Sequence, residues 1–78
     1  MEALAGIIRF HRKKAGLTQI ALARLAGVGK ATVFDVEKGK TSVQLDKLLS
    51  ILAVLNIRIH FQGPLMAEYE KSASKGSR

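Results

Sequence analysis

The chain has 78 residues, with thirteen Lys and Arg against six Asp and Glu, which gives a net charge of +7 at pH 7. This length allows one compact domain whose core is only marginally stable by itself, so help from a partner subunit is expected. The charge favours a phosphate-rich partner over an acidic protein, with a merely soluble basic surface as the alternative. The sequence has no cysteine and no long apolar N-terminal segment, so disulfides, thiolate sites, a signal peptide and a membrane span are excluded. A cytoplasmic protein is expected.

The first helical pattern occupies the N-terminal residues and ends near Gly16. Its apolar face is formed by residues that recur at helical spacing, namely Leu4, Ile7, Ile8, His11 and Ala15. Gly16 provides the left-handed residue that commonly ends a helix. His11 is expected to be a packed, hydrogen-bonded residue rather than a ligand.

Two further short helices follow, separated by the turn Gly27-Val28-Gly29. Thr18 is a good N-cap for the second helix, and Gly27 closes it after little more than two turns. The third helix begins after Gly29 and stops at Gly39. The residues expected to face inward are Leu22, Ala23 and Ala26 in the second helix and Val33 and Val36 in the third. Such short helices cannot stand alone.

A fourth helix, capped by Ser42, is expected to contribute to two surfaces. Its apolar positions extend well beyond one stripe: Leu45, Leu48, Leu49, Ile51, Leu52, Val54 and Leu55. One face can fill the core of a single chain, and the surplus requires a partner.

The segment after this helix alternates as a strand does and is bounded by Gly63-Pro64. A lone strand has no pairing partner in the chain, so the same strand of a second copy is expected to pair with it. The expected dimer interface consists of Ile51, Leu55, Ile57, Ile59 and Phe61. The predicted organisation is a DNA-binding domain over residues 1–56, a dimerising strand over 57–64 and a disordered tail over 65–78.

Two adjacent helices in a basic chain indicate a helix-turn-helix, which places the start of its second helix in the major groove. The residues expected to contact bases are Lys30, Ala31, Thr32, Phe34 and Asp35. Lysine can donate to guanine, and alanine can touch a thymine methyl group. Lys30 is the leading candidate, with a solvated lysine or a phosphate contact as the alternative.

A second set of residues is expected to contact the DNA backbone, which positions a protein without specifying sequence. These residues are Thr18, Gln19, Lys38, Lys40, Thr41 and Ser42, with an exposed helix start and a solvated loop as the alternatives.

Arg12 and Glu37 are expected to form an ion pair that fixes the angle of the third helix. Two distant histidines without a carboxylate cluster make a metal site or a general-base pair improbable, and the Gly27-Val28-Gly29-Lys30 run lacks the remaining residues of a nucleotide-phosphate loop. No enzyme activity, cofactor, metal or small-molecule substrate is expected.

The segment LTQIALARLAGVGKATVFDVEKGK resembles the phage-repressor and Cro type of helix-turn-helix, the Xre family. The following TSVQLDKLLSILAVLNIRIHFQGP resembles the HipB-like antitoxin subgroup, and the likeness covers roughly residues 3 to 66. It implies a homodimeric repressor that binds a palindromic operator at its own promoter and neutralises a HipA-like serine/threonine kinase toxin. It assigns DNA-facing roles to Gln19, Lys30, Ala31, Thr32 and Asp35, and an ion pair to Arg12 and Glu37.

The chain departs from the family pattern at Gly29, Ile20 and Ala31, and Phe34 occupies a position that is usually polar.

The helical and strand patterns together predict a mainly α fold. It is a repressor-type domain of four to five helices with one C-terminal β-strand that pairs across a homodimer. Two other functions stay open. One is a stand-alone phage-type or restriction-modification regulator without a toxin, and the other is a protein-interaction adaptor that has lost DNA binding.

Overall fold

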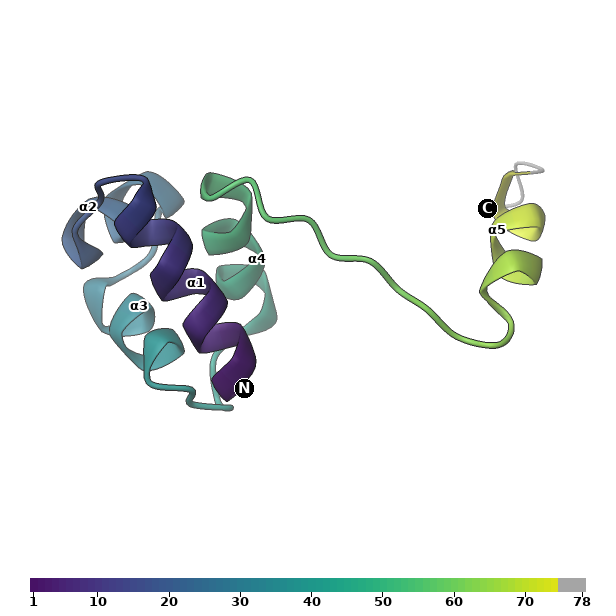
Figure 1. Cartoon of the computed structure of the whole chain (residues 1–78), viewed down its shortest axis with the longest axis horizontal. Coiled ribbons are helices and arrows are strands. Elements are labelled where there is room, and N and C mark those ends of the chain that lie inside the picture. The colour runs from purple at the N-terminus through teal and green to yellow at the C-terminus, as the bar shows by residue number, and fades with distance from the viewer. Residues whose placement is uncertain (75–78) are drawn as a thin grey trace.

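The computed structural model describes residues 1–74, which form five helices (Figure 1). They are α1 (Glu2–Lys14), α2 (Gln19–Ala26), α3 (Lys30–Glu37), α4 (Leu45–Val54) and α5 (Met66–Ser74). The first four pack together into a body, whereas α5 lies apart at the end of an extended segment (Figure 1). The mainly α fold with four to five helices is confirmed.

The core of the body draws on all four of its helices. Ile8, Leu22, Val33, Val36 and Ile51 have no exposed side-chain surface, and Ala23 and Leu52 complete the buried cluster. Full burial of one such aliphatic side chain stabilises a fold by about 1.5 to 3 kcal/mol. The inward positions predicted for the second and third helices are confirmed, with Ala26 half-buried against the cluster.

The turn between α2 and α3 follows the sequence prediction closely. The Thr18 hydroxyl accepts a hydrogen bond from the Ala21 amide at 3.0 Å, so Thr18 caps α2. Gly27 ends α2 with φ of 71°, a left-handed conformation that costs a residue with a Cβ free energy. Gly29 is extended, and α3 starts at Lys30. These residues fix the direction in which α3 leaves α2.

Three expectations about the body are wrong. Ser42 does not cap α4, because residues 42–44 are not helical and the helix starts at Leu45 with an extended Gln44 at the N-cap. His11 is exposed rather than packed, although its Nδ1 lies 2.7 Å from the carbonyl oxygen of Ile7. The apolar face of α1 is narrower than predicted, because Ile8 is fully buried while Ile7 is 45% exposed.

Ile51 was expected at a dimer interface, but it is fully buried in the core of the body. The apolar residues of α4 surround the helix, so the sequence leaves open which of them face inward. The packing of α1, α2 and α3 decides this by enclosing Ile51 and Leu52. Ile51 therefore contributes to the fold of one chain and not to a surface.

The chain leaves the body at Asn56, which adopts a left-handed conformation with φ of 58°. The Ile57 amide donates to the Leu52 carbonyl oxygen at 2.9 Å, which closes the end of α4 in the way a left-handed cap does. We call residues 58–74 the arm. Its first part, up to Gly63, is extended, and residues 1–74 contain no β-strand because this segment has no neighbour to pair with.

The sequence predicted a disordered tail from residue 65, and the structure corrects this prediction for Met66–Ser74, which form α5. The segment MAEYEKSAS is rich in good helix formers, so intrinsic propensity rather than an apolar stripe accounts for the helix. Residues 75–78 of the predicted tail lie outside the described residues. The arm raises the Cα radius of gyration to 15.1 Å, against about 11.5 Å for a compact domain of this length.

Candidate nucleic-acid interface

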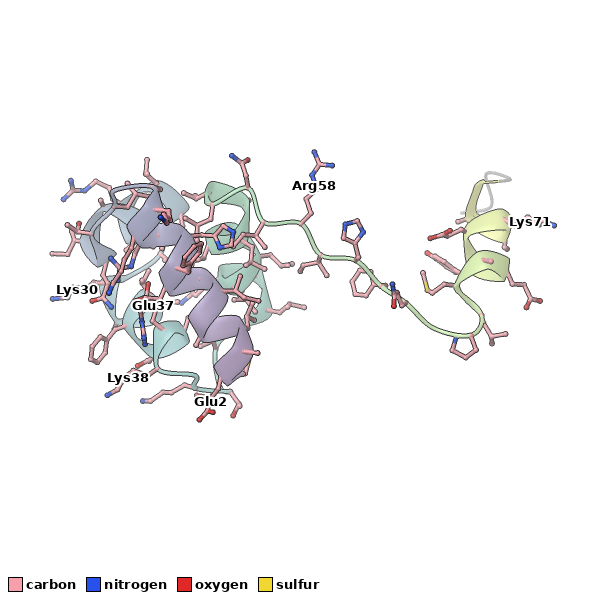
Figure 2. All side chains as sticks on the ribbon, viewed as in Figure 1. Glu2, Lys30, Glu37, Lys38, Arg58 and Lys71 are labelled. Atoms are coloured by element: carbon pink, nitrogen blue, oxygen red, sulfur yellow. The ribbon has the colours of Figure 1, made fainter. Side chains whose placement is uncertain are left out.

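The side chains of α3 divide between the core and the surface. Val33, Val36 and Glu37 are buried, so the opposite side presents Lys30, Ala31 and Phe34 to solvent. Lys30 and Lys38 extend from the surface of the body, whereas Glu37 lies among the helices (Figure 2). The exposed side of α3 is therefore cationic.

Three of the predicted base-contacting residues lie together. Lys30, Ala31 and Phe34 line one hollow of about 420 Å³, and Gln19 from the start of α2 completes its wall. The Lys38 ammonium lies 4.7 Å from the centre of the Phe34 ring, a cation–π contact that joins residues one helical turn apart. The Phe34 side chain remains 45% exposed. We call this site the Phe34 hollow.

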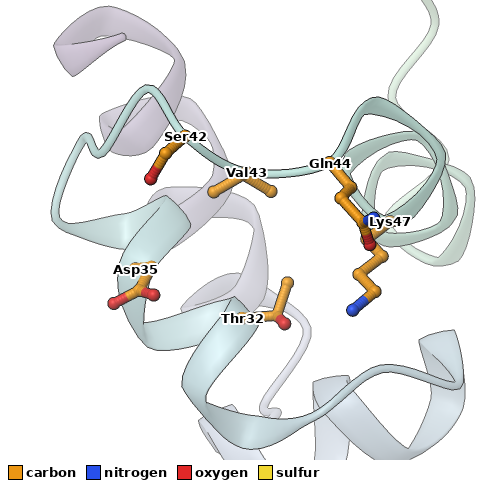
Figure 3. Close-up of a pocket in the computed structure, with 6 residues that line it drawn as sticks. All are labelled: Thr32, Asp35, Ser42, Val43, Gln44 and Lys47. Atoms are coloured by element: carbon orange, nitrogen blue, oxygen red, sulfur yellow. The ribbon is translucent and has the colours of Figure 1, made fainter.

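The other two predicted base-contacting residues, Thr32 and Asp35, face a second hollow of about 200 Å³ beside the start of α4 (Figure 3). Ser42, Val43, Gln44 and Lys47 form its opposite side. The structure thus separates the predicted base-contacting set into two neighbouring groups. Gln44 and Lys47 were not predicted as DNA contacts. Their signal in the sequence is a polar residue and a lysine three positions apart at the start of a helix.

The predicted backbone-contacting residues have different local partners. Lys38, Lys40, Thr41 and Ser42 are exposed in the segment that follows α3. The Lys40 ammonium lies 3.6 Å from an oxygen of Asp35, and such an exposed pair is worth between zero and about 1 kcal/mol. Thr18 uses its hydroxyl to cap α2. The exposed pair of Lys40 and Asp35 can open at little cost, whereas Thr18 would give up its cap bond to reach outward.

A buried carboxylate holds α3 against α1 and α2. Glu37 is 3% exposed, and Arg12 donates to both of its oxygens, from Nε at 2.6 Å and from Nη2 at 3.0 Å. Gln19 donates from Nε2 to Oε1 of Glu37 at 3.2 Å, and Arg12 Nη1 donates to the Leu17 carbonyl oxygen. The ion pair between Arg12 and Glu37 is present as predicted, and Gln19 turns out to belong to the same cluster.

Arg9 also belongs to this cluster, and the sequence analysis missed it. Its guanidinium donates to the Glu37 carbonyl oxygen at 2.8 Å and lies 3.9 Å from the Glu37 carboxylate. The available signal was the spacing, because Arg9 and Arg12 are three residues apart and therefore share a helix face. Arg9 thus binds the main chain of Glu37 at the end of α3, while Arg12 binds its side chain.

The ionisation of Glu37 follows from these partners. Burial by itself raises the pKa of the carboxyl group, but the hydrogen bonds from Arg12 and Gln19 and the charges of Arg12 and Arg9 outweigh it, so the pKa is lowered. Glu37 is therefore a carboxylate at neutral pH. In residues 1–74, every buried side-chain nitrogen or oxygen has a hydrogen-bond partner.

The predicted dimer residues outside the core differ in exposure. Leu55 and Ile57 are half-buried and pack against the core of the body. Ile59 and Phe61, in the arm, are 47% and 73% exposed. The exposed apolar surface of the predicted interface is therefore concentrated in the arm.

The part of the chain that the structure describes offers neither a cluster of metal ligands nor a membrane-spanning helix. It contains no group of three His, Cys, Asp or Glu side chains that could hold a metal ion. None of its helices has the length and apolar character needed to cross a bilayer.

Comparison with known sequences identifies the helix pair as the shared feature. The helix-turn-helix family model matches residues 8–62. An uncharacterized HTH-type transcriptional regulator of Sinorhizobium fredii, y4mF, is 36% identical over 61 residues, which are 78% of this chain and 80% of that protein. An HTH-type transcriptional regulator of Methanothermobacter thermautotrophicus is 49% identical over 39 residues, which are 50% of this chain and 56% of that protein.

Comparison with solved structures gives the same fold. A chain of a HipA-HipB-O2-O3 complex superimposes with a TM-score of 0.72 and 25% sequence identity, over 81% of this chain and 89% of that one. A chain from a complex of a HipB variant with an O2 20mer gives the same TM-score and identity, over 81% of this chain and 88% of that one. The resemblance to HipB that the sequence suggested is confirmed at the level of the fold.

Proposed function

This chain belongs to the helix-turn-helix family and is a DNA-binding transcription regulator, and we propose that it is a homodimeric repressor that also serves as an antitoxin. Its DNA site would be a palindromic operator at its own promoter, and its toxin partner a HipA-like serine/threonine kinase in the cytoplasm. The observation that carries the DNA-binding part is the cationic, exposed side of α3, held in place by the buried cluster around Glu37.

Base reading is proposed for the exposed side of α3. Lys30 stands at the first position of the helix beside Ala31, where a side chain can reach the base edges of a major groove. Thr32 and Asp35 would contact the neighbouring base pair from the second hollow. Lys30→Ala should weaken specific binding by about 1 to 3 kcal/mol and relax the preference at one base pair. A loss that is equal for every sequence would reassign Lys30 to a phosphate.

Phosphate contacts are proposed for Thr18, Gln19, Lys38, Lys40, Thr41 and Ser42. If a dimer neutralises roughly six to ten phosphates, raising salt from 50 to 200 mM should weaken binding by about three to five orders of magnitude. Lys40→Ala should weaken all sequences alike, and it serves as the matched control for Lys30→Ala. A shallow salt dependence of the dissociation constant would contradict this proposal.

Dimerisation is proposed to pair the extended segment of the arm with its copy in a second chain. Ile57, Ile59 and Phe61 alternate with polar residues. Ile59 and Phe61 are exposed in the single chain, which supports a face that a second chain covers in the dimer. Such a dimer would carry its two α3 helices about 34 to 36 Å apart, matching successive major grooves. Ile59→Lys should yield monomers by light scattering, whereas an unchanged dimer mass would remove this interface.

The antitoxin role is supported by the likeness to HipB over 81% of the chain. The direct test is co-expression with a HipA-like kinase encoded beside the gene, followed by purification of the tagged chain and a phosphorylation assay. A stable complex with an inhibited kinase is expected. A kinase that stays active and fails to co-purify would contradict the antitoxin role without affecting DNA binding.

A second candidate is a stand-alone regulator without a toxin. It requires only the DNA-binding role, which this chain shares with the relative y4mF, an uncharacterized HTH-type transcriptional regulator. Pull-down of the tagged protein from its native cells separates the two, because it would recover DNA together with a kinase in one case and DNA alone in the other.

A further inference from the structure

The Phe34 hollow combines an apolar wall with a cationic rim. Ala31 and Phe34 provide the apolar wall, and Lys30 and Gln19 provide polar groups beside it. We propose that this hollow receives the 5-methyl group of a pyrimidine in the major groove, which makes Phe34 a specificity-determining residue. This inference rests on the proposed binding of DNA through α3 and names the base feature that α3 selects.

The shape of the hollow suits a methyl group. Ala31 projects only a methyl group, so it leaves room next to Phe34, which stands one turn further along the same side of α3. The Phe34 ring keeps 45% of its surface exposed, and water is a poor solvent for that surface. A methyl group seated between the two side chains would remove apolar surface of protein and DNA from water together.

The hollow is also surrounded by polar and cationic side chains. The Lys38 ammonium lies 4.7 Å from the centre of the Phe34 ring, which ties the ring to a lysine expected at a phosphate. Lys30 lines the hollow itself, where its ammonium can donate to a base oxygen or nitrogen beside the methyl group. The amide of Gln19 is oriented by its hydrogen bond to buried Glu37. The groups around the hollow therefore suit the surface of a DNA groove, which is negatively charged and rich in hydrogen-bond acceptors.

The occupant follows from the chemistry of the groove. Among the unmodified bases only thymine presents a methyl group there. A 5-methylcytosine would present the same group at the same place, so the ligand is defined as a 5-methylpyrimidine. A charged peptide would satisfy the lysines but not the apolar wall, and a purely apolar partner would leave the lysines desolvated without acceptors.

The experiment begins with selection of 20-base-pair duplexes from a random, unmethylated library by the full chain. Each thymine of the selected duplex is then replaced by deoxyuridine, which removes the methyl group and keeps the pairing, and dissociation constants are measured by fluorescence anisotropy. One thymine per half-site should respond, with a loss of about fourfold for each methyl group removed. In Phe34→Ser the same replacement should change the affinity by less than about 1.5-fold.

The chain offers a matched control. Phe10 on α1 is 58% exposed and has Lys14 at 5.7 Å from its ring, so it repeats the spacing and exposure of Phe34 and Lys38 outside the Phe34 hollow. Phe10→Ser should retain the full response to deoxyuridine. Both variants alter exposed side chains, and circular dichroism checks that each keeps its helices.

The outcomes separate this inference from the proposed function. If the chain retains no duplex above background, the proposed DNA reading fails and this inference fails with it. If duplexes are retained but every deoxyuridine replacement is neutral, or Phe34→Ser responds as fully as the unaltered protein, only the methyl reading is overturned. Where selected duplexes carry cytosine in place of the responding thymine, binding that is about fourfold tighter after 5-methylation would identify methylcytosine as a second source of the methyl group.

Discussion

The body and the arm differ in how far their apolar side chains are buried. In the body, the core side chains of α1 to α4 are enclosed by one another, and Ile51 has no exposed surface. In the arm, apolar side chains remain in water, with Phe61 73%, Leu65 68% and Tyr69 64% exposed. The two regions are joined at Asn56, whose left-handed conformation ends α4.

This difference separates what one chain can stabilise from what needs a second molecule. Four short helices reach a stable arrangement because each covers its neighbours and because Glu37 ties α3 to α1 and α2. The arm makes few such contacts, so its apolar residues gain little within a single chain. The effect of a mutation on stability should therefore be independent of protein concentration in the body and should depend on it in the arm.

The largest effect is expected at Ile51. Ile51→Ala removes side-chain atoms from the middle of a closed core, so the free energy of unfolding should fall by about 2 to 5 kcal/mol. Ile59→Ala is the matched control, because the same atoms are removed from an arm residue that is 47% exposed. Denaturation at two protein concentrations measures both.

The Ile51 loss should be present at every concentration, and the Ile59 loss should appear only where dimers form. A small, concentration-dependent effect of Ile51→Ala would instead return that residue to the interface.

The next effect is expected in the buried ion cluster. Glu37→Gln removes the charge that compensates Arg12 and should lower the free energy of unfolding by about 2 to 3 kcal/mol, or roughly 8 to 24 °C in Tm. The loss should be below that of a fully buried pair, since the Arg12 side chain retains 11% exposure and its bond to Leu17. Glu68→Gln, an exposed glutamate of α5, is the control for thermal denaturation.

A pH profile should show the same cluster in the unaltered protein. The pKa of Glu37 is lower in the folded chain than in the unfolded chain, where glutamate titrates near about 4.3. Its contribution to stability is therefore complete above that value and is lost as pH falls through the lower, folded pKa. Stability measured from pH 6 down to pH 2 should decline over this window, and Glu37→Gln should flatten the decline. An equal slope in both proteins would assign the acid sensitivity to other carboxyl groups.

The body was largely predictable because its signals are local. The cap at Thr18, the left-handed Gly27 and the inward Val33 and Val36 each depend on a few neighbouring residues. The ion pair between Arg12 and Glu37 was also foreseen, because Arg12 lies late in the first helix and Glu37 at the end of the third.

The remaining features depend on forces that the sequence pattern does not display. The start of α4 at Leu45 rather than near Ser42 follows from the extended backbone of Gln44, which stands at the N-cap. The position of Ile51 depends on where three other helices pack. In the Phe34 hollow, the meeting of Gln19 with α3 joins residues from two helices, and only the folded chain brings them together.

A smaller effect is expected at the cap of α2. Thr18→Ala removes the acceptor of the Ala21 amide and should destabilise the body by about 1 kcal/mol, whereas Thr18→Ser should keep most of the stability. Because Gln19 follows the cap and binds Glu37, loosening this turn should also weaken the buried cluster. Chemical denaturation of the two variants measures the difference, and equal stability would show that solvent replaces the cap.

The smallest effect is expected from removal of residues 65–78, which takes away α5 and leaves the extended segment in place. No side chain of the core comes from the described part of this region, residues 65–73, so the free energy of unfolding of the body should change by less than about 0.5 kcal/mol at low protein concentration. If dimers rely on the strand alone, the dimer mass should also persist. A loss of several kcal/mol would mean that α5 packs against the body or against a second chain. The boundary between the part that one chain stabilises and the part that needs a second molecule would then lie towards the end of the arm and not at Asn56.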